Sequence, residues 1–273
     1  MNNFFLAFIS AFLLLGLGCN PAEAEPVYLL IEGVELRTNE AQQGAATQDV
    51  TEAWVFVNNV LLGVFDLPAR VPVLADGEAE IRVEMGVREN GLSQLPNIFP
   101  FYAPYETNLT LVAGQTYALG ILPFGYRSTT VFGIIEDFEN NRPRIFTDLL
   151  TGNSSLRISN SNPRSGSNCG QLTLDLSNPV AEITSLLNFL PQGLTPEYWL
   201  EVDVLADVPV VWGLVGFDGQ GALGRYLALA HGPMANGPNS ISTSLIYLTF
   251  LTSTPSASAF RPTSKKMELT AGR

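Results

Sequence analysis

The sequence is poor in the residues on which much hydrolytic and metal-dependent chemistry relies. Its 273 residues include one histidine, His231, and two cysteines, Cys19 and Cys169. A single histidine excludes a metal site built on two histidines. It also gives little basis for a histidine-based catalytic triad, because His231 stands directly before Gly232 and Pro233, where a turn is expected. The sequence therefore predicts a non-enzymatic protein.

Positive charge is scarce as well. Lysine and arginine together number 14 against 26 acidic residues, and the net charge is −12. Nucleic-acid binding needs a basic surface, so no nucleic-acid partner is expected. The same charge balance gives no attraction to anionic lipid, so any membrane attachment has to come from covalently bound acyl chains.

Residues 1–18 have the pattern of a secretion signal. Residues 4–15 are almost wholly apolar, and this stretch is shorter than the ~20 residues of a membrane-spanning helix. The small residue Gly18 precedes Cys19, which predicts that residues 1–18 are removed and that Cys19 becomes the acylated first residue of the mature chain. The alternative is an ordinary secretory signal cleaved after Ala22 or Ala24, with Cys19 incidental.

The second cysteine, Cys169, has no disulfide partner if Cys19 is acylated. It lies at the end of a run of serine, asparagine and glycine over residues 158–170, which we expect to be an exposed loop. No neighbouring residue in the sequence would activate its thiol. We therefore interpret Cys169 as an ordinary residue at the start of a strand, with a reactive thiol as the alternative.

The rest of the chain shows the patterns of short β-strands. Glycine occurs 24 times and proline 18 times, while apolar residues make up 46% of the chain, so many turns and a sizeable core are expected. Alternation over residues 79–85 would place Ile81, Val83 and Met85 on one buried face. Asn58 and Asn59 separate two apolar runs and predict a hairpin turn, because asparagine tolerates a positive φ.

Other segments are assigned by their breaks in this pattern. Pro68 and Pro72 predict an edge strand or a bend. Residues 37–51 and 140–156 are expected to be loops, and residues 180–189 are the one candidate helix. Strands without intervening helices predict an all-β fold of antiparallel β-sandwiches. The expected organisation is a tether over residues 19–26, a first sandwich over residues 27–126 and a second over residues 127–273.

Acidic residues give the candidates for cation binding and for acid–base chemistry. Glu136, Asp137 and Glu139 cluster in sequence and could supply the hard oxygen ligands that calcium prefers. Glu201 and Asp203 alternate on an expected strand, so their side chains would lie on one face about 7 Å apart. That spacing is compatible with the two carboxylates of a glycosidase. Alternating acidic residues also occur on the solvated face of a sandwich strand, and we favour this second interpretation.

Aromatic residues are the candidates for ligand binding. Trp199, Trp212 and Tyr226 lie on expected strands of the C-terminal half. An exposed tryptophan or tyrosine on a sandwich can stack on a sugar ring, so these three residues form a possible glycan site. Packing in the core is the alternative for each of them.

Four stretches resemble a group of surface and outer-membrane lipoproteins from Bacteroidota. They are the acidic residues Glu23 and Glu25 after Cys19, residues 51–68 (TEAWVFVNNVLLGVFDLP), residues 90–102 with their Asn-Gly and Pro-Phe-Tyr, and residues 136–139 (EDFE). The resemblance implies an N-terminal β-sandwich and a C-terminal jelly roll similar to carbohydrate-binding modules. It also implies a location at the outer membrane or cell surface.

These observations together predict a lipid-anchored envelope protein that binds a glycan or an outer-membrane protein partner. One alternative is a carbohydrate-active hydrolase that uses carboxylates of the C-terminal half. Another is a structural accessory subunit of an outer-membrane complex, which an exposed apolar patch would indicate.

Overall fold

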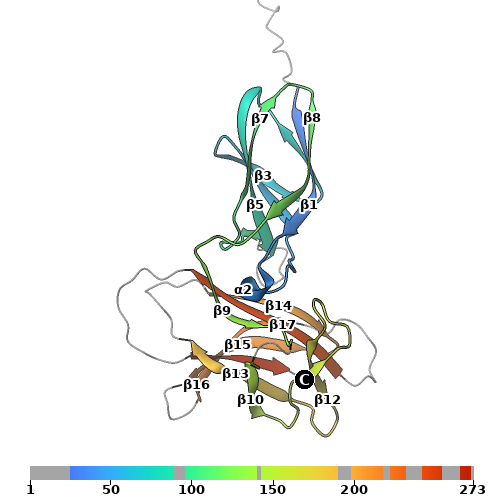
Figure 1. Ribbon diagram of the computed structural model, residues 1–273, viewed down its shortest axis with the longest axis vertical. Coiled ribbons are helices and arrows are strands. Elements are labelled where there is room, and N and C mark those ends of the chain that lie inside the picture. The colour runs from blue at the N-terminus through green and yellow to red at the C-terminus, as the bar shows by residue number, and fades with distance from the viewer. Residues whose placement is uncertain are drawn as a thin grey trace, which may run out of the picture.

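The computed structural model describes residues 25–88, 96–139, 143–189, 198–217, 222–231, 242–253 and 265–271. These residues form an all-β protein with a single short helix, α2 (Glu40–Gln43), in the described part of the chain (Figure 1). The expected all-β class is confirmed. The described residues include no helix with the length and hydrophobicity that crossing a membrane requires.

The N-terminal half is a sandwich of two sheets. One sheet has the order β4-β1-β8, and the other has the order β3-β2-β5-β6 with β7 also paired to β5. The strands are β1 (Val27–Leu36), β2 (Glu52–Val57), β3 (Val60–Asp66), β4 (Ala69–Val73), β5 (Gly77–Arg88), β6 (Pro96–Ile98), β7 (Tyr105–Leu111) and β8 (Thr116–Phe124).

The core of this sandwich follows from alternation along the strands. Ile81, Val83 and Met85 of β5 are almost completely buried, as their spacing predicts. From the facing sheet, Leu29 and Ile31 of β1 pack into the same cluster. Burial of such side chains is the main favourable contribution to folding, at roughly 1.5–3 kcal/mol each.

The pairing of β1 with β8 departs from the expected antiparallel pattern. Tyr28 lies opposite Thr116 and Leu36 lies opposite Phe124, so the first and last strands of the sandwich run parallel. A parallel pair cannot be joined by a tight turn. Here all of β2 to β7 lies between the two strands in sequence, so the connection is long enough.

The C-terminal half is built from two further sheets. Their orders are β10-β13-β18-β15-β16 and β11-β12-β17-β14, with β9 also paired to β17. The strands are β9 (Thr130–Glu136), β10 (Phe146–Thr151), β11 (Arg157–Ser159), β12 (Cys169–Leu174), β13 (Ala181–Phe189), β14 (Tyr198–Ala206), β15 (Val210–Phe217), β16 (Ala222–His231), β17 (Ser242–Ser253) and β18 (Lys265–Ala271).

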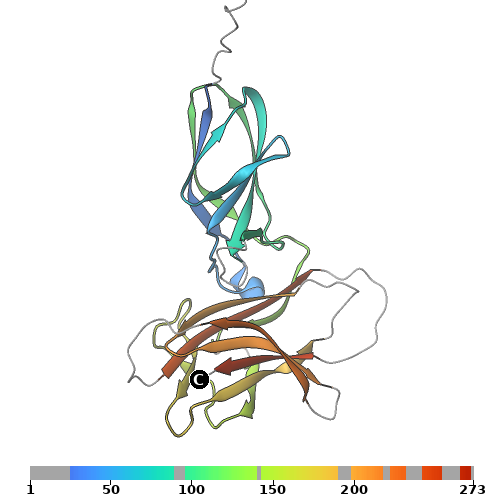
Figure 2. The same cartoon turned by 180° about the vertical axis from the view of Figure 1, so that it is seen from behind.

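A second cluster of buried side chains lies between these sheets. Ile134 and Leu172 come from one sheet, and Ile183 and Trp212 come from the other. The long axis of the N-terminal sandwich is vertical in Figures 1 and 2. The C-terminal half lies below it, with strands that run across the direction of the N-terminal strands. The chain enters β1 at the end of the N-terminal sandwich that is farthest from the C-terminal half.

Local turn chemistry agrees with the sequence predictions. Asn58 and Asn59 have φ values of 50° and 64° and connect β2 to β3 in an antiparallel hairpin. The side chain of Asn58 also accepts a hydrogen bond from the backbone N–H of Glu80 at 2.9 Å, which ties the hairpin tip to β5. Pro68 directly precedes β4 and Pro72 lies within it. β4 is an edge strand, as predicted.

Three segment predictions are wrong. Residues 37–51, expected to be a loop, include the four-residue helix α2. Residues 180–189, the candidate helix, contain β13, which is paired between β10 and β18. Ile183, Thr184 and Ser185 are all buried, so this strand lacks the alternation that identifies a half-exposed strand, and pairing with distant strands decides its conformation. Residues 140–156, expected as a loop, contain β10, whose Phe146 is buried in the core.

The loop expected over residues 158–170 needs a smaller correction. It contains the end of β11 and the start of β12, which pair with each other through Ser159 and Cys169. Most of the residues between these strands are exposed, as expected.

The hairpin tip gives a test of the turn geometry. In Asn59→Val, a β-branched side chain would occupy the left-handed region, which should lower the free energy of unfolding by about 1–2 kcal/mol. Asn59→Gly should leave stability unchanged or raise it slightly, because glycine adopts positive φ readily. Urea unfolding of both variants measures the difference, and equal stabilities would contradict the assigned turn.

Candidate functional site

Of the aromatic residues proposed for glycan binding, Trp199 and Trp212 pack against other parts of the protein. Trp212 lies on β15 with 3% of its surface exposed, inside the core of the C-terminal sandwich, so its side chain is not available to a ligand. Trp199, on β14, is partly buried and meets the ring of Phe99 edge-on, with 5.1 Å between ring centroids. Tyr226 lies on β16, where its backbone pairs with Leu214 of β15, and its side chain is not among those that the structure describes.

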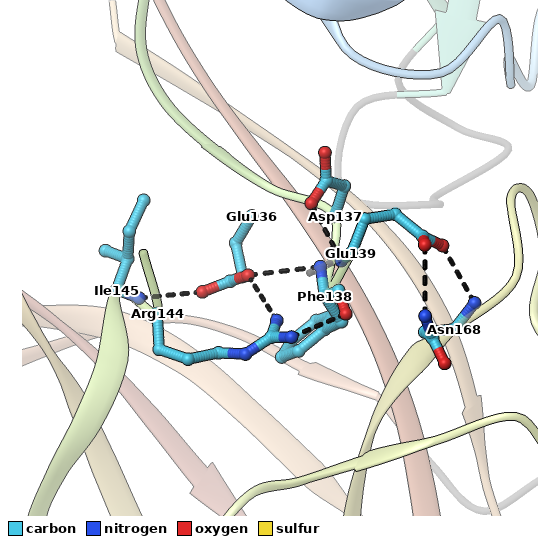
Figure 3. A network of polar contacts seen from close by, with 7 residues as sticks. All are labelled: Glu136, Asp137, Phe138, Glu139, Arg144, Ile145 and Asn168. Carbon is cyan, nitrogen blue, oxygen red and sulfur yellow. Dashed lines mark hydrogen bonds and ion pairs between the residues drawn. The ribbon is translucent and has the colours of Figure 1, made fainter. Parts of the chain in front are cut away.

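The acidic cluster at the end of β9 has a structural role (Figure 3). The buried carboxylate of Glu136 accepts hydrogen bonds from the backbone N–H of Ile145 at 2.7 Å and of Phe138 at 3.1 Å. Arg144 donates to the same carboxylate at 3.0 Å and to the carbonyl oxygen of Phe138 at 2.5 Å. These bonds hold Phe138 at a φ of 58°, a left-handed conformation that a bulky residue rarely adopts.

The other two acidic residues of the cluster, Asp137 and Glu139, accept hydrogen bonds from different N–H groups. Asp137 accepts from the backbone N–H of Glu139 at 2.9 Å. Glu139 accepts a hydrogen bond from the backbone N–H of Ser167 at 2.7 Å. It also accepts bonds from the backbone and the side chain of Asn168 at 2.8 Å and 3.0 Å (Figure 3). These bonds to N–H groups lower the pKa of Glu139.

The calcium prediction for Glu136, Asp137 and Glu139 is therefore corrected. The described residues contain no group of three or more His, Cys, Asp or Glu side chains that could hold a metal ion. The oxygens that a cation would need already accept bonds from N–H groups and from Arg144. The cluster holds the turn between β9 and β10 and the neighbouring loop at Asn168.

Glu201 lies where the two sandwiches meet. Its carboxylate, on β14, accepts a hydrogen bond from the hydroxyl of Tyr126 at 2.7 Å and one from the hydroxyl of Tyr102 at 3.3 Å. Burial raises the pKa of Glu201 to about 7, and the nearby Asp203 adds to this effect. The two tyrosine hydroxyls act in the opposite direction, because they hydrogen-bond the charged form.

Asp203, two residues further along β14, also contacts the N-terminal half. It accepts a hydrogen bond from the hydroxyl of Thr47 at 2.6 Å, and the guanidinium of Arg164 lies 3.6 Å away. Glu201 and Asp203 thus share one strand face, as their alternation predicts. The expectation that this face is solvated is wrong at Glu201, which the N-terminal half buries, whereas the side chain of Asp203 is 25% exposed.

Aromatic packing and one arginine complete this junction. Tyr126 packs edge-on against Phe132 of β9, with ring centroids 4.8 Å apart, and at a tilt against Tyr102, with ring centroids 5.1 Å apart. Arg127, in the connection between the sandwiches, binds Glu84 of β5 at 3.2 Å and the carbonyl oxygen of Pro100 at 3.1 Å. The connection is therefore fixed to the N-terminal sandwich at several points.

Cys169 is the first residue of β12, as expected. Its side chain is buried, and its sulfur lies 3.3 Å from the carbonyl oxygens of Ser159 and Ser161. Burial raises the pKa of the thiol, which disfavours the reactive thiolate. His231 ends β16, where its backbone pairs with Val210.

A groove of about 810 Å³ lies at the far end of the N-terminal sandwich. It opens between β3 and β4, which are the edge strands of the two facing sheets. Its lining includes Leu61 and Leu62 of β3 and Leu74 just after β4. Pro26, which precedes β1, also borders it, so the groove lies beside the point where the chain enters the described structure.

The groove exposes an apolar surface. Val60, Leu62 and Val64 of β3 are 69%, 40% and 41% exposed, and Leu74 is 72% exposed. Within the described part of the chain, the polar lining consists of Glu25 and Asn58. The sequence predicts this hairpin but not the exposure of its apolar residues. The available signal was the run from Val60 to Val64, which is apolar at every position instead of alternating with polar residues.

Comparisons with known proteins give no relative for this chain. No family model matches it, and no curated protein or solved structure matches it either. The function therefore has to be inferred from the residues and their geometry.

The bonds of Glu136 give a test of its structural role. Glu136→Ala should lower the free energy of unfolding by about 3–5 kcal/mol, because it leaves Arg144 and two N–H groups without their acceptor. Asp175→Ala, in an exposed turn, is the control and should cost about 1 kcal/mol or less. Millimolar calcium should leave the melting temperature of the wild-type protein unchanged, and a calcium-dependent rise that Glu136→Ala abolishes would contradict this assignment.

The burial of Glu201 predicts a pH dependence of stability. Its pKa is about 7 in the folded protein and 4.5 ordinarily, so the folded state binds the proton more tightly. Stability should therefore decrease as the pH rises from about 4.5 to about 7, by roughly 3 kcal/mol at most. Glu201→Gln keeps a neutral hydrogen-bonding side chain and should remove this decrease.

Urea unfolding of both proteins at pH 4.5, 6 and 8 measures this effect. The two should be similar in stability at pH 4.5, and Glu201→Gln should be the more stable at pH 8. Glu32→Gln, at an exposed position on β1, is the matched control for the loss of one glutamate. Equal slopes for wild type and Glu201→Gln would contradict the assignment.

Proposed function

We propose that this chain is a lipid-anchored, non-enzymatic protein of the outer membrane or cell surface that binds an outer-membrane protein partner. The observation that carries the proposal is the apolar groove between β3 and β4, placed at the end of the molecule where the chain enters from residue 24. The lipoprotein-like sequence around Cys19 supports it.

The position of the groove relative to Cys19 limits where it can act. From Cys19 to Glu25 there are six residues, which can span at most about 20 Å. With Cys19 acylated, the groove would therefore stay near the membrane surface, while the C-terminal sandwich lies at the other end of the molecule. A partner for the groove would have to be found close to the bilayer.

The chemistry of the groove favours a protein partner over a glycan. Glycan sites need exposed aromatic rings together with polar side chains, whereas this lining is mostly aliphatic. Trp212 is buried, and Trp199 contacts Phe99 at the junction. Aliphatic side chains exposed together are typical of surfaces that dock on another protein.

The anchor is tested by replacing the cysteine. Cys19→Ser should move the protein from the membrane fraction to the soluble fraction, because its charge of −12 gives no other attraction to the bilayer. Cys169→Ser is the matched control and should leave the protein in the membrane fraction. Intact mass of the wild-type protein should show the added acyl groups. Membrane retention of Cys19→Ser together with an unmodified mass would contradict the lipid anchor.

The partner is tested separately. A detergent pull-down of the full-length protein, run beside a glycan array, should give a stable protein partner and an empty array. Binding to a defined glycan without a protein partner would overturn this part of the proposal.

A further inference from the structure

We infer that the groove receives an extended apolar segment of the partner protein, which adds as a strand to the free edge of β3. This inference rests on the proposed function and names how the partner is recognised. It is argued from the sheet topology, the exposure of β3 and the charges around the groove.

The sheet topology leaves β3 open to pairing. It is bonded to β2 on one side and ends its sheet on the other. A long apolar edge strand presents unpaired backbone N–H and C=O groups, and it readily accepts another strand. Proteins protect such edges with charged residues, proline or bulges. From Val60 to Phe65, β3 contains no charged residue and no proline, and its pairing with β2 has one register shift, at Leu62.

The two sides of the groove are not equivalent. β4 contains Pro72, which cannot donate a backbone hydrogen bond, and its Arg70 lies over the ring of Tyr28 with 3.2 Å to the ring centroid. These features reduce the capacity of β4 to accept a strand. The added segment would therefore pair with β3 and rest its side chains on the apolar surface toward β4, where Leu74 is exposed.

The charges near the groove specify the ends of the segment. Glu25 lines the groove, and Glu80 lies within 3.5 Å of the Asn59 side chain at the hairpin tip. Within the described residues, the lining contains no lysine or arginine. An apolar segment flanked by lysine or arginine would complement these carboxylates. The same carboxylates repel anionic lipid headgroups, which argues against insertion of the groove into the bilayer.

Photo-crosslinking in intact cells tests the inference. The probe is benzoyl-phenylalanine placed at Leu62 in the full chain, with Ile121 of β8 as the matched position, since both residues are exposed. Leu62 should crosslink to one other protein, and mass spectrometry should map the adduct to an extended apolar segment flanked by basic residues. Ile121 should give no such adduct.

Several results would overturn it. Adducts at Leu62 with lipid alone, with a second copy of this chain or with a polar segment would each exclude strand addition by the partner. So would a yield at Leu62 no higher than at Ile121. A peptide of the mapped segment should slow hydrogen exchange at the β3 amides, and the same peptide with a central proline should not. Equal protection by both peptides would also overturn the inference.

A pair of charge variants separates this inference from the proposed function. Leu62→Lys should reduce recovery of the partner about tenfold or more, whereas Ile121→Lys should not change it. Both side chains are exposed, so the fold is retained in each variant. Undiminished recovery with Leu62→Lys would overturn the groove as the docking site but leave the proposed function standing. Absence of any partner with the wild-type protein would overturn both.

Discussion

The arrangement of the two sandwiches depends on one buried carboxylate at their junction. Glu201 projects from the C-terminal sandwich and accepts hydrogen bonds from Tyr102 and Tyr126 of the N-terminal half. The chain connection alone would allow the halves to rotate about it. The tyrosine hydroxyls require the carboxylate in one place, and the contact between Phe99 and Trp199 fills the space beside it. Glu201 and the aromatic contact therefore join the two halves directly, in addition to the chain connection.

Two of the acidic residues that the sequence offered as candidates for chemistry, Glu136 and Glu201, stabilise the fold in similar ways. Glu136 holds a left-handed turn, and Glu201 holds the junction. In both cases the carboxylate is buried and accepts several hydrogen bonds, which is the condition under which a buried acid is stable. Arginine is scarce in this chain, yet it is used where carboxylates are buried. Arg144 binds Glu136, Arg82 and Arg127 bind Glu84, and Arg88 binds Glu52.

What could be predicted from the sequence was local. The turn at Asn58 and Asn59 and the buried face of Ile81, Val83 and Met85 follow from neighbouring residues. β13 was missed because its conformation depends on pairing with strands far away in sequence.

The same distinction applies to the candidate site. The alternation of Glu201 and Asp203 was visible, but the tyrosines that cover Glu201 lie 75 and 99 residues away in sequence. The prolines predicted that β4 is an edge strand, but no local pattern tells that β3 of the other sheet ends beside it, which is what forms the groove. Trp212 looked like a possible ligand residue for the same reason, since only the assembled sheets place it in the core.

The parallel pairing of β1 with β8 has a mechanical consequence. The chain enters β1 at Val27, at one end of the N-terminal sandwich, and leaves β8 at Phe124, at the other end. A force that pulls these two points apart acts along both strands in opposite directions. It loads the hydrogen bonds between them in shear and all at once, instead of opening them one after another. The N-terminal sandwich is therefore built to resist extension between its two ends.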